Sequence, residues 1–353
     1  MMIYATVIAL TLGVNWLFTE LRYKKKRIDQ ITISFFFLSY LFLLCARDYS
    51  VGVDTHNYIK SFEISRLLTW KEQMQFENTE IGFMLLRSAV SFFGGARLFI
   101  VVVSVLTVIP VLYLYRTEAE DSIMCVAFFL ISLLFEMFFS GMRQSIAIGL
   151  AVPAYFFVKQ KKKIGFLLTV LLAYCFHKSA IVLLLLYPTY HLRLTKKWLW
   201  CVVPLMGLVA LKREMLMDLI FRVAGEEYTY NYSYLTGSSG QKGLMMLFVL
   251  IAVYCYVMLD ESKAGEEEIG LRNILLLATL IHLFTPLNPT ISRINYYFIL
   301  FIPVAISRIN NRCGDHLLQI RSVASIVMPA FFIMYFFLMK SDSLNVFNYK
   351  FCF

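Results

Sequence analysis

Long apolar runs dominate the chain, and short polar connections separate them. Clear examples are Leu98–Tyr115, Leu244–Leu259 and Ser322–Met339. Because a helix rises about 1.5 Å per residue, about 20 apolar residues cross the hydrocarbon core of a bilayer. The regular alternation of apolar and polar residues that is typical of a transmembrane barrel does not occur. The pattern therefore predicts an all-α protein, a polytopic bundle of transmembrane helices.

We expect about 12–13 membrane helices. They lie near residues 2–19, 31–46, 81–115, 122–139, 143–158, 164–176, 179–191, 198–211, 243–259, 273–287, 290–306 and 322–339. Gly94 and Gly95 interrupt the third run. We therefore interpret residues 81–93 as a re-entrant or interfacial helix and residues 97–115 as the true crossing.

Two polar segments are longer than the others. Residues 46–80 form the first large external loop, with an amphipathic helix predicted at His56–Leu68, and residues 212–242 form the second. The acidic run Glu266–Glu268 reads as a solvated turn on the cytoplasmic side. No further boundary is evident, so we expect a single integral membrane domain over residues 1–353.

Charge reports the orientation of the chain. The net charge is +10, but the basic residues lie mainly in alternate connections, which indicates a positive-inside bias. This bias places Lys24–Arg27 and Lys161–Lys163 in the cytoplasm and Arg143, His177 and Arg293 on the outer side. No nucleic-acid-binding motif occurs, so we expect no nucleic-acid partner. The seven cysteines lie mainly in or beside apolar runs without a CxxC pair, which predicts neither a disulfide framework nor a metal site.

The first external loop carries polar residues that have two interpretations each. Asp54 precedes a helix, where a carboxylate is typical of an N-cap but can also mark the start of an anion-binding site. Arg47 is either a snorkelling anchor or a contact for the same anion. Glu80 begins the helix at residue 81, where the helix dipole favours a carboxylate. It would also serve as a general base, particularly if partial burial raises its pKa.

Further candidates lie at the other outer helix ends. Arg143 is either a snorkelling residue or a bidentate phosphate ligand, and the second interpretation is favoured. His177 lies in a tight turn and is either a cap or a base. Arg293 and Tyr297 share a helix face. The tyrosines at 228–234 are either an interfacial belt or a stacking surface for sugar rings. Three arginines on one side suit a substrate that carries phosphates.

Several short motifs occur in a characteristic order. They are Arg47…Val51-Gly52-Val53-Asp54-Thr55…Tyr58, Glu80-x-Gly82-Phe83, Arg143-Gln144-x-x-Ala147, Phe176-His177-Lys178-Ser179-Ala180 and Arg293…Tyr297-Phe298. From about residue 30 to residue 305 the chain thereby resembles the EpsG family of bacterial exopolysaccharide and O-antigen repeat-unit polymerases of the Wzy type. Where the family motif has a polar residue between Gly and Asp, this chain has Val53.

The resemblance implies a GT-C-like fold and a glycosyltransferase at the outer face of the bacterial cytoplasmic membrane. Its substrates would be oligosaccharide units on undecaprenyl diphosphate, joined into O-antigen, capsular or exopolysaccharide. A flippase and a chain-length regulator are expected partners, and no cofactor is expected. The implied roles are base for Glu80, Asp54 or His177, diphosphate binding for Arg143, Arg293 and Arg47, and glycan binding for Tyr58, Gln144, Tyr228, Tyr230 and Tyr297.

Two other functions compete with this one. A transporter or flippase of lipid-linked oligosaccharide would carry interrupted helices in two halves, with polar residues at the bilayer midplane. Here the polar residues lie at helix ends, which disfavours transport. A membrane acyltransferase would need a deeper His or Ser constellation than His177 alone supplies. A passive membrane subunit has no need for arginines repeated on one face.

Overall fold

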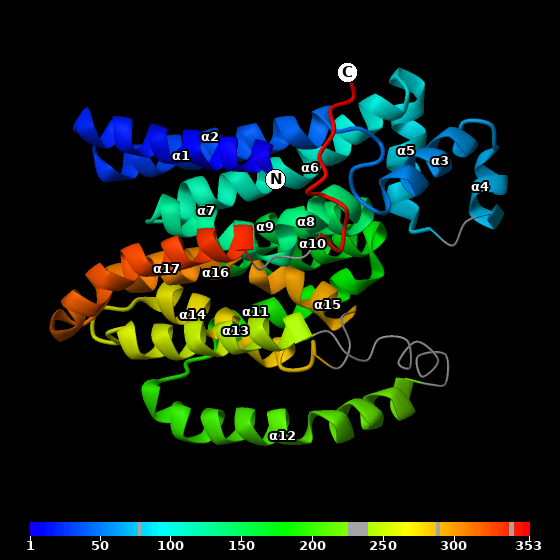
Figure 1. Ribbon diagram of the computed structural model, residues 1–353. Helices are drawn as coiled ribbons and strands as arrows, with labels where there is room; N and C mark the ends of the chain where they lie inside the picture. Colours follow the sequence, from blue (N-terminus) through cyan, green and yellow to red (C-terminus); the bar gives the residue numbers. More distant parts are fainter. Residues whose placement is uncertain (77–78, 225–238, 287–289, 339–341) are drawn as a thin grey trace. The chain divides into compact units, whose positions relative to one another are not determined.

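The computed structural model describes residues 1–76, 79–224, 239–286, 290–338 and 342–353. These residues are mainly helical, and no β-strand occurs among them (Figure 1), which confirms the all-α prediction. The chain divides into two compact units. Unit 1 contains Met1–Leu184 and Val323–Phe353, and unit 2 contains Leu185–Ser322.

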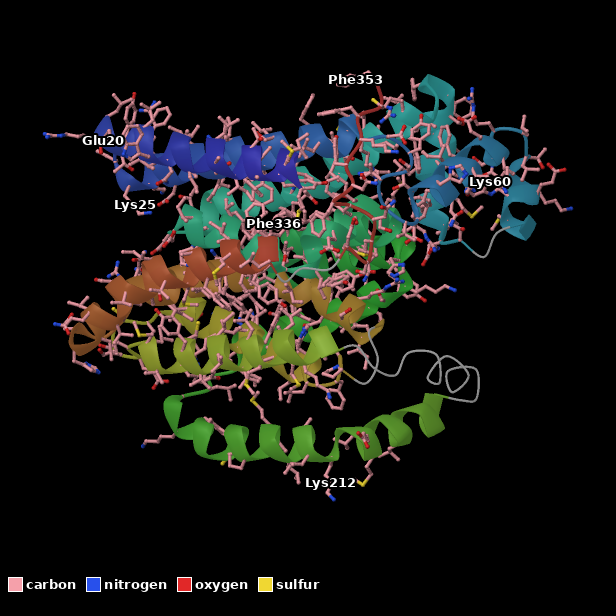
Figure 2. The ribbon with its side chains drawn as sticks, viewed as in Figure 1. Glu20, Lys25, Lys60, Lys212, Phe336 and Phe353 are labelled. Carbon is pink, nitrogen blue, oxygen red and sulfur yellow. The ribbon has the colours of Figure 1, made fainter. Side chains whose placement is uncertain are left out.

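Unit 1 carries most of the motifs that the sequence analysis singled out. Its elements are α1 (Met2–Glu20), α2 (Lys25–Ala46), α3 (Thr55–Ser65), α4 (Trp70–Phe76), α5 (Ile81–Phe93), α6 (Ala96–Glu118), α7 (Ser122–Ile131), α8 (Leu133–Ser140), α9 (Met142–Lys159), α10 (Lys163–Phe176), the 3-10 helix η1 (Lys178–Leu185) and most of α17 (Leu318–Leu338). Helix α2 packs against α1, α6 and α7, and α9 packs between α6 and α10. Glu20 and Lys25 mark one end of the α1–α2 hairpin, and Lys60 lies at the opposite end of the unit (Figure 2).

Among the residues that the structure describes, four helices are long and apolar enough to cross a membrane: α1, α2, α6 and the segment Asp315–Leu338. Helices α7 and α8 add a fifth candidate if the pair, bent by 62° at Ser132, counts as one span. These helices are those of a multi-pass membrane protein. Other predicted runs form shorter apolar helices such as α5 and α10.

The helix breaks agree only in part with the sequence pattern. The predicted interruption at Gly94-Gly95 is confirmed, since α5 ends at Phe93 and α6 begins at Ala96. The predicted helix at 290–306 instead divides into α15 (Thr290–Ile299) and α16 (Ile302–Asn311). Pro303 stands in the first turn of α16, and proline cannot donate the backbone hydrogen bond of a helix interior.

Unit 2 is arranged around α14 (Glu266–His282), which packs against α11 (Leu186–His191), α13 (Ser239–Met258), α15 and α16. The remaining elements are the 3-10 helices η2 (Lys196–Trp198) and η4 (Asp315–Leu317), and α12 (Leu199–Ala224). Residues 212–224, expected to be loop, are therefore helical, and residues 239–242 begin α13. Only residues 225–238 of that segment lie outside the described residues.

The acidic run Glu266–Glu268 is the first turn of α14. The prediction of a solvated turn is wrong for Glu268, whereas the Glu266 side chain is exposed. Glu268 is buried and its Oε2 accepts a hydrogen bond from the Gly265 N–H at 2.9 Å. Glu267 pairs with Arg308. Carboxylates at a helix N-terminus are stabilised by the helix dipole, so this charge belongs to the packing of unit 2.

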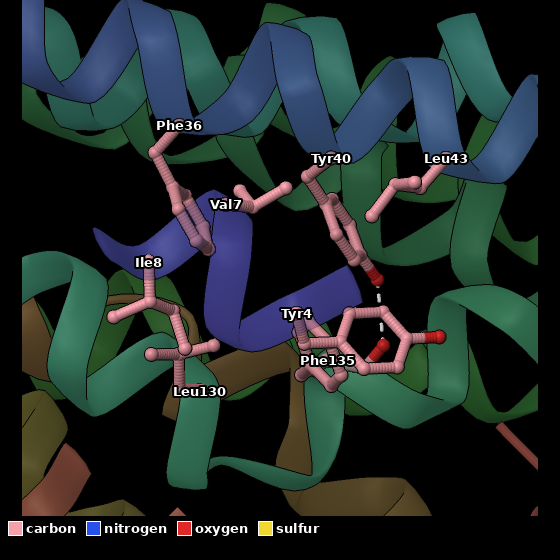
Figure 3. Close-up of a pocket in the computed structure, with 8 residues that line it drawn as sticks. All are labelled: Tyr4, Val7, Ile8, Phe36, Tyr40, Leu43, Leu130 and Phe135. Carbon is pink, nitrogen blue, oxygen red and sulfur yellow. Dashed lines mark hydrogen bonds between the residues drawn. The ribbon is translucent and has the colours of Figure 1, made fainter. Parts of the chain in front are cut away.

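Aromatic side chains fill the core of unit 1. Tyr40 is 1% exposed, and its hydroxyl donates a hydrogen bond to the Phe135 carbonyl at 2.6 Å. Tyr40 and Phe135 also line a small pocket (Figure 3), whose other walls are formed by Tyr4, Val7, Ile8, Phe36, Leu43 and Leu130. The pocket has a free volume of about 10 Å³ and an apolar lining, so it holds no more than about one water molecule and cannot take a sugar.

Candidate functional site

Glu80 is the centre of the candidate site, and three elements of unit 1 supply its partners. Its Oε2 lies 2.6 Å from Nη1 of Arg143, at the start of α9. Its Oε1 lies 3.2 Å from Nδ1 of His177, which follows α10. The Lys178 N–H donates a hydrogen bond to Oε1 at 3.3 Å. The structure thus joins three residues that the sequence singled out separately.

The basic side chains of the site are more exposed to solvent than its carboxylate. The Glu80 side chain is 8% exposed, whereas the side chains of Arg143 and His177 are 30% and 26% exposed. The carboxylate therefore lies beneath a guanidinium and an imidazole that solutes can reach. Because a guanidinium presents a planar fork of donors, Arg143 can exchange this carboxylate for the oxygens of a phosphate group.

The electrostatic balance at Glu80 favours its ionised form. Burial raises the pKa of this carboxyl group, but the contact with His177 and the charge of Arg143 outweigh burial and hold the pKa at about 2. The rise that partial burial alone would produce is therefore absent. In this pairing Glu80 is a weak base, and its carboxylate holds the Arg143 side chain through the ion pair.

Gly82 explains how α5 delivers Glu80 to its partners. A β-carbon at this position would lie 2.7 Å from the Cys175 carbonyl oxygen near the end of α10. Only glycine allows this close approach of two backbones. The glycine of the Glu80-x-Gly82-Phe83 motif thereby places the start of α5 against the turn that carries His177.

An aromatic cluster supports the other side of the site. The Tyr58 hydroxyl from α3 interacts with the Arg143 side chain, and the Tyr58 ring packs edge-on against Phe83 with ring centroids 5.6 Å apart. Phe62 and Phe99 continue this cluster with ring centroids 4.9 Å apart. The cluster joins α3, α5, α6 and α9, so the position of Arg143 is tied to a packed core.

The motif at residues 51–55 packs against the end of α8, the segment that precedes Arg143 in the sequence. Gly52 has a φ of +90°, and a β-carbon there would lie 2.4 Å from the Phe139 carbonyl oxygen. The Thr55 hydroxyl donates a hydrogen bond to the same oxygen at 3.0 Å. Phe139 and Ser140 end α8, and α9 begins at Met142, so this motif contacts the chain immediately before the helix that carries Arg143.

Asp54 stands at the N-cap position of α3, but its side chain makes no capping hydrogen bond. That part of the N-cap prediction is wrong. Its Oδ2 instead accepts a hydrogen bond from the Ser140 hydroxyl at 3.1 Å, and the Ser140 oxygen accepts one from the Asp54 N–H at 3.1 Å. Ser140 is a site neighbour that the sequence pattern did not reveal, because it lies inside an apolar run.

Arg47 is not exposed as a substrate ligand would be. The residue is 1% exposed, and its guanidinium carbon lies 5.5 Å from the centroid of the Phe139 ring. Within the described part of the chain, its Nε and Nη1 have no hydrogen-bond partner. Burial lowers the pKa of Arg47 to about 10, so the side chain remains a cation at neutral pH.

The structure places three further candidates on α9 and α15. Gln144 is 2% exposed within α9. Arg293 and Tyr297 belong to α15 in unit 2, where Arg293 is exposed and Tyr297 is 0% exposed. Tyr228 and Tyr230 lie outside the described residues. Among the residues that were searched, no group of His, Cys, Asp and Glu is arranged to hold a metal ion.

The fold and the site together define a helical membrane protein with a charged cluster at the ends of short helices. The chain belongs to the EpsG family, whose model matches residues 30–351. Membership in this family indicates a role in polysaccharide biosynthesis. No match to a curated protein and no match to a solved structure was found.

Proposed function

We propose that the protein is a polymerase that joins lipid-linked oligosaccharide repeat units into a polysaccharide. The observation that carries this proposal is the cluster of Arg143, Glu80 and His177, in which an accessible cation lies over a buried carboxylate. The donor would be a growing glycan on undecaprenyl diphosphate, and the acceptor would be the next lipid-linked unit. The product would be O-antigen, capsular or exopolysaccharide.

The reaction is a displacement at the anomeric carbon of the donor glycan. An acceptor hydroxyl oxygen forms the new bond, the bond from the anomeric carbon to the diphosphate oxygen breaks, and the hydroxyl proton passes to a base. The leaving diphosphate gains negative charge, which a guanidinium held nearby stabilises in the transition state. Arg143 has this role in the proposal, and Arg293 is the other candidate for it.

Glu80 is the proposed base. While it is paired, its pKa of about 2 makes it a poor proton acceptor. When the diphosphate binds Arg143, the ion pair between Arg143 and Glu80 breaks. The pKa of Glu80 then rises, because a nearby positive charge is withdrawn. Donor binding would thereby prepare the base for the acceptor. His177 and Asp54 are the alternative bases, and His177 is the nearer of the two to Glu80.

The other expected residues have supporting roles in this proposal. Tyr58 would contact the first sugar, and Tyr228 and Tyr230 would contact more distant sugars. Gln144 and Tyr297, which are buried in this structure, would contact the glycan only after a rearrangement that exposes them. Arg47 would assist only after a rearrangement that exposes it. We further propose a GT-C-like fold with about 12–13 membrane helices, a site facing outward from the bacterial cytoplasmic membrane, and a flippase and a chain-length regulator as partners.

The test uses the full chain in nanodiscs with a synthetic undecaprenyl-diphosphate oligosaccharide. The wild type is expected to produce a ladder of polymer lengths. Arg143→Ala is expected to produce none, because the charge on the leaving diphosphate is then not stabilised and Glu80 has lost its ion-pair partner. Arg66→Ala is the matched control, since Arg66 is a half-exposed arginine of the same external region and pairs only at the surface with Glu63.

An unchanged ladder from Arg143→Ala would contradict the assignment of Arg143. Deletion of the gene in its host separates the competing functions. Loss of long polysaccharide with a single unit still attached supports a polymerase. Loss of the single unit as well indicates a flippase, and an unchanged ladder with altered decoration indicates an acyltransferase.

A further inference from the structure

The C-terminal segment, residues 342–353, lies against the motif loop, residues 47–55. In Figure 1 its red trace runs beside the loop that follows α2. Backbone N–H groups donate to carbonyl oxygens at 2.9–3.0 Å in four pairs: Asp48 to Lys350, Gly52 to Asn345, Val53 to Leu344, and Cys352 to Ala46. Arg47 and Phe351 also form an antiparallel bridge. Both ends of the loop are therefore held.

The C-terminal segment contains a hydrogen-bonded turn around Asn345. Asn345 has a φ of +51°, a left-handed conformation that asparagine tolerates better than other residues with a β-carbon. Its side-chain Nδ2 donates a hydrogen bond to the Ser50 carbonyl oxygen at 2.9 Å. The Asp342 carboxylate accepts the Phe347 N–H at 3.1 Å, and Val346 is 0% exposed. The segment thus presents a defined surface to the motif loop.

The opposite face of the motif loop contacts the end of α8. Thr55 and Gly52 meet the Phe139 carbonyl oxygen, and Asp54 bonds to Ser140. Arg143 follows within the first turn of α9. The motif loop is therefore held between the C-terminal segment and the start of the helix that carries the accessible guanidinium.

We propose that the C-terminal segment is a clasp that positions Arg143 for the lipid diphosphate by holding the motif loop against the end of α8. Asn345 is its central positioning residue, because it supplies both a backbone acceptor for Gly52 and a side-chain donor for Ser50. The inference rests on the proposed function, in which Arg143 binds the diphosphate. Without the clasp, part of the donor's binding energy is used to bring Arg143 into place, so donor binding weakens. Once the donor is bound, Arg143 still contacts the diphosphate and still releases Glu80, so kcat changes little.

The test compares three variants of the full chain in nanodiscs with the same lipid-linked donor. Asn345→Ala removes the Ser50 hydrogen bond and strains the left-handed backbone. Asn345→Gly removes only the hydrogen bond, because glycine adopts a positive φ freely. Ser343→Ala is the matched control at an exposed position of the same segment. We expect the KM for the donor to rise about tenfold in Asn345→Ala and about threefold in Asn345→Gly, with kcat within about twofold.

A second measurement does not depend on activity. Hydrogen exchange is followed in peptides that cover residues 48–55 and residues 137–144. Asn345→Ala should accelerate exchange in both peptides, since release of the motif loop frees the end of α8. Ser343→Ala should accelerate neither.

Three outcomes are decisive. A wild-type protein that forms no polymer overturns the proposed function. An active wild type whose KM for the donor is unchanged in Asn345→Ala overturns the clasp alone. Faster exchange confined to residues 48–55 also overturns it, because the constraint then does not reach α8. If Asn345→Ala fails to fold, the same criteria apply to Asn345→Gly.

Discussion

Arginines with similar sequence settings have different structural roles in this protein. Arg47 and Arg143 both lie at helix ends within the short sequence motifs. Arg47 is 1% exposed over an aromatic ring, whereas the Arg143 side chain is 30% exposed over a carboxylate. Arg87, which the sequence pattern did not single out, is also 1% exposed and bonds to Ser61. Access to solvent, which depends on packing between distant segments, separates a site arginine from a buried one.

The pairing at Glu80 predicts a pH-dependent contribution to stability. The folded pKa of about 2 lies below the ordinary value of 4.5. The contribution is therefore complete above about pH 4.5 and is lost as the pH falls toward about 2. We expect Glu80→Gln to lower the Tm of the solubilised protein at about pH 7, and the difference from wild type to shrink at about pH 3.

The control for this prediction is Glu63→Gln, because Glu63 pairs with Arg66 at the surface and is 49% exposed at its side chain. Exposed pairs contribute little to stability, so its Tm should remain near that of the wild type at both pH values. Equal Tm values for Glu80→Gln and the wild type at about pH 7 would show that the ion pair does not stabilise the fold.

At the scale of the elements, the sequence predicts the positions of individual helices but not the contacts between residues that are far apart in the chain. Apolar runs located α1, α2 and α6, and a glycine pair located the break between α5 and α6. The 62° bend at Ser132 has apolar residues on both sides, so periodicity gives no sign of it. The ion pair between Glu80 and Arg143 joins residues 63 positions apart, and only tertiary packing brings them together.

The contact between α5 and α10 gives a prediction at this scale. Gly82→Ala would push a methyl group toward the Cys175 carbonyl oxygen, which a β-carbon approaches to 2.7 Å. The two helices must then separate, and Glu80 moves away from His177. We expect loss of polymer in the nanodisc assay and a lower Tm, although alanine is by itself favoured over glycine in a helix by about 1 kcal/mol.

Gly13→Ala is the matched control, since a β-carbon at Gly13 in α1 meets nothing within 4 Å. It should keep full activity and at least the stability of the wild type. If Gly82→Ala behaved in the same way, the close approach of α5 and α10 would not position the site.

The orientation of the whole molecule in the membrane can be measured directly. In unit 1 the basic residues near Lys25 and the helix that carries Lys60 lie at opposite ends (Figure 2). The positive-inside bias assigns the Lys25 end to the cytoplasm. We expect an alkaline phosphatase fused after Ser65 to be active, because the enzyme folds outside the cytoplasm, and one fused after Lys162 to be inactive. The reverse pattern would place the candidate site on the cytoplasmic side.

The pairing of the motif loop with the C-terminal segment also sets the time at which the site can form during synthesis. The hydrogen bond from Asn345 to Ser50 spans 295 residues. At about 5–20 residues per second, the loop waits on the order of 15–60 s for its partner to be made. Until then neither the loop nor the start of α9 has its final support. If the clasp acts as proposed, we expect a nascent chain to stay inactive until residues 342–353 have been translated, even when the helices before them are already in the membrane.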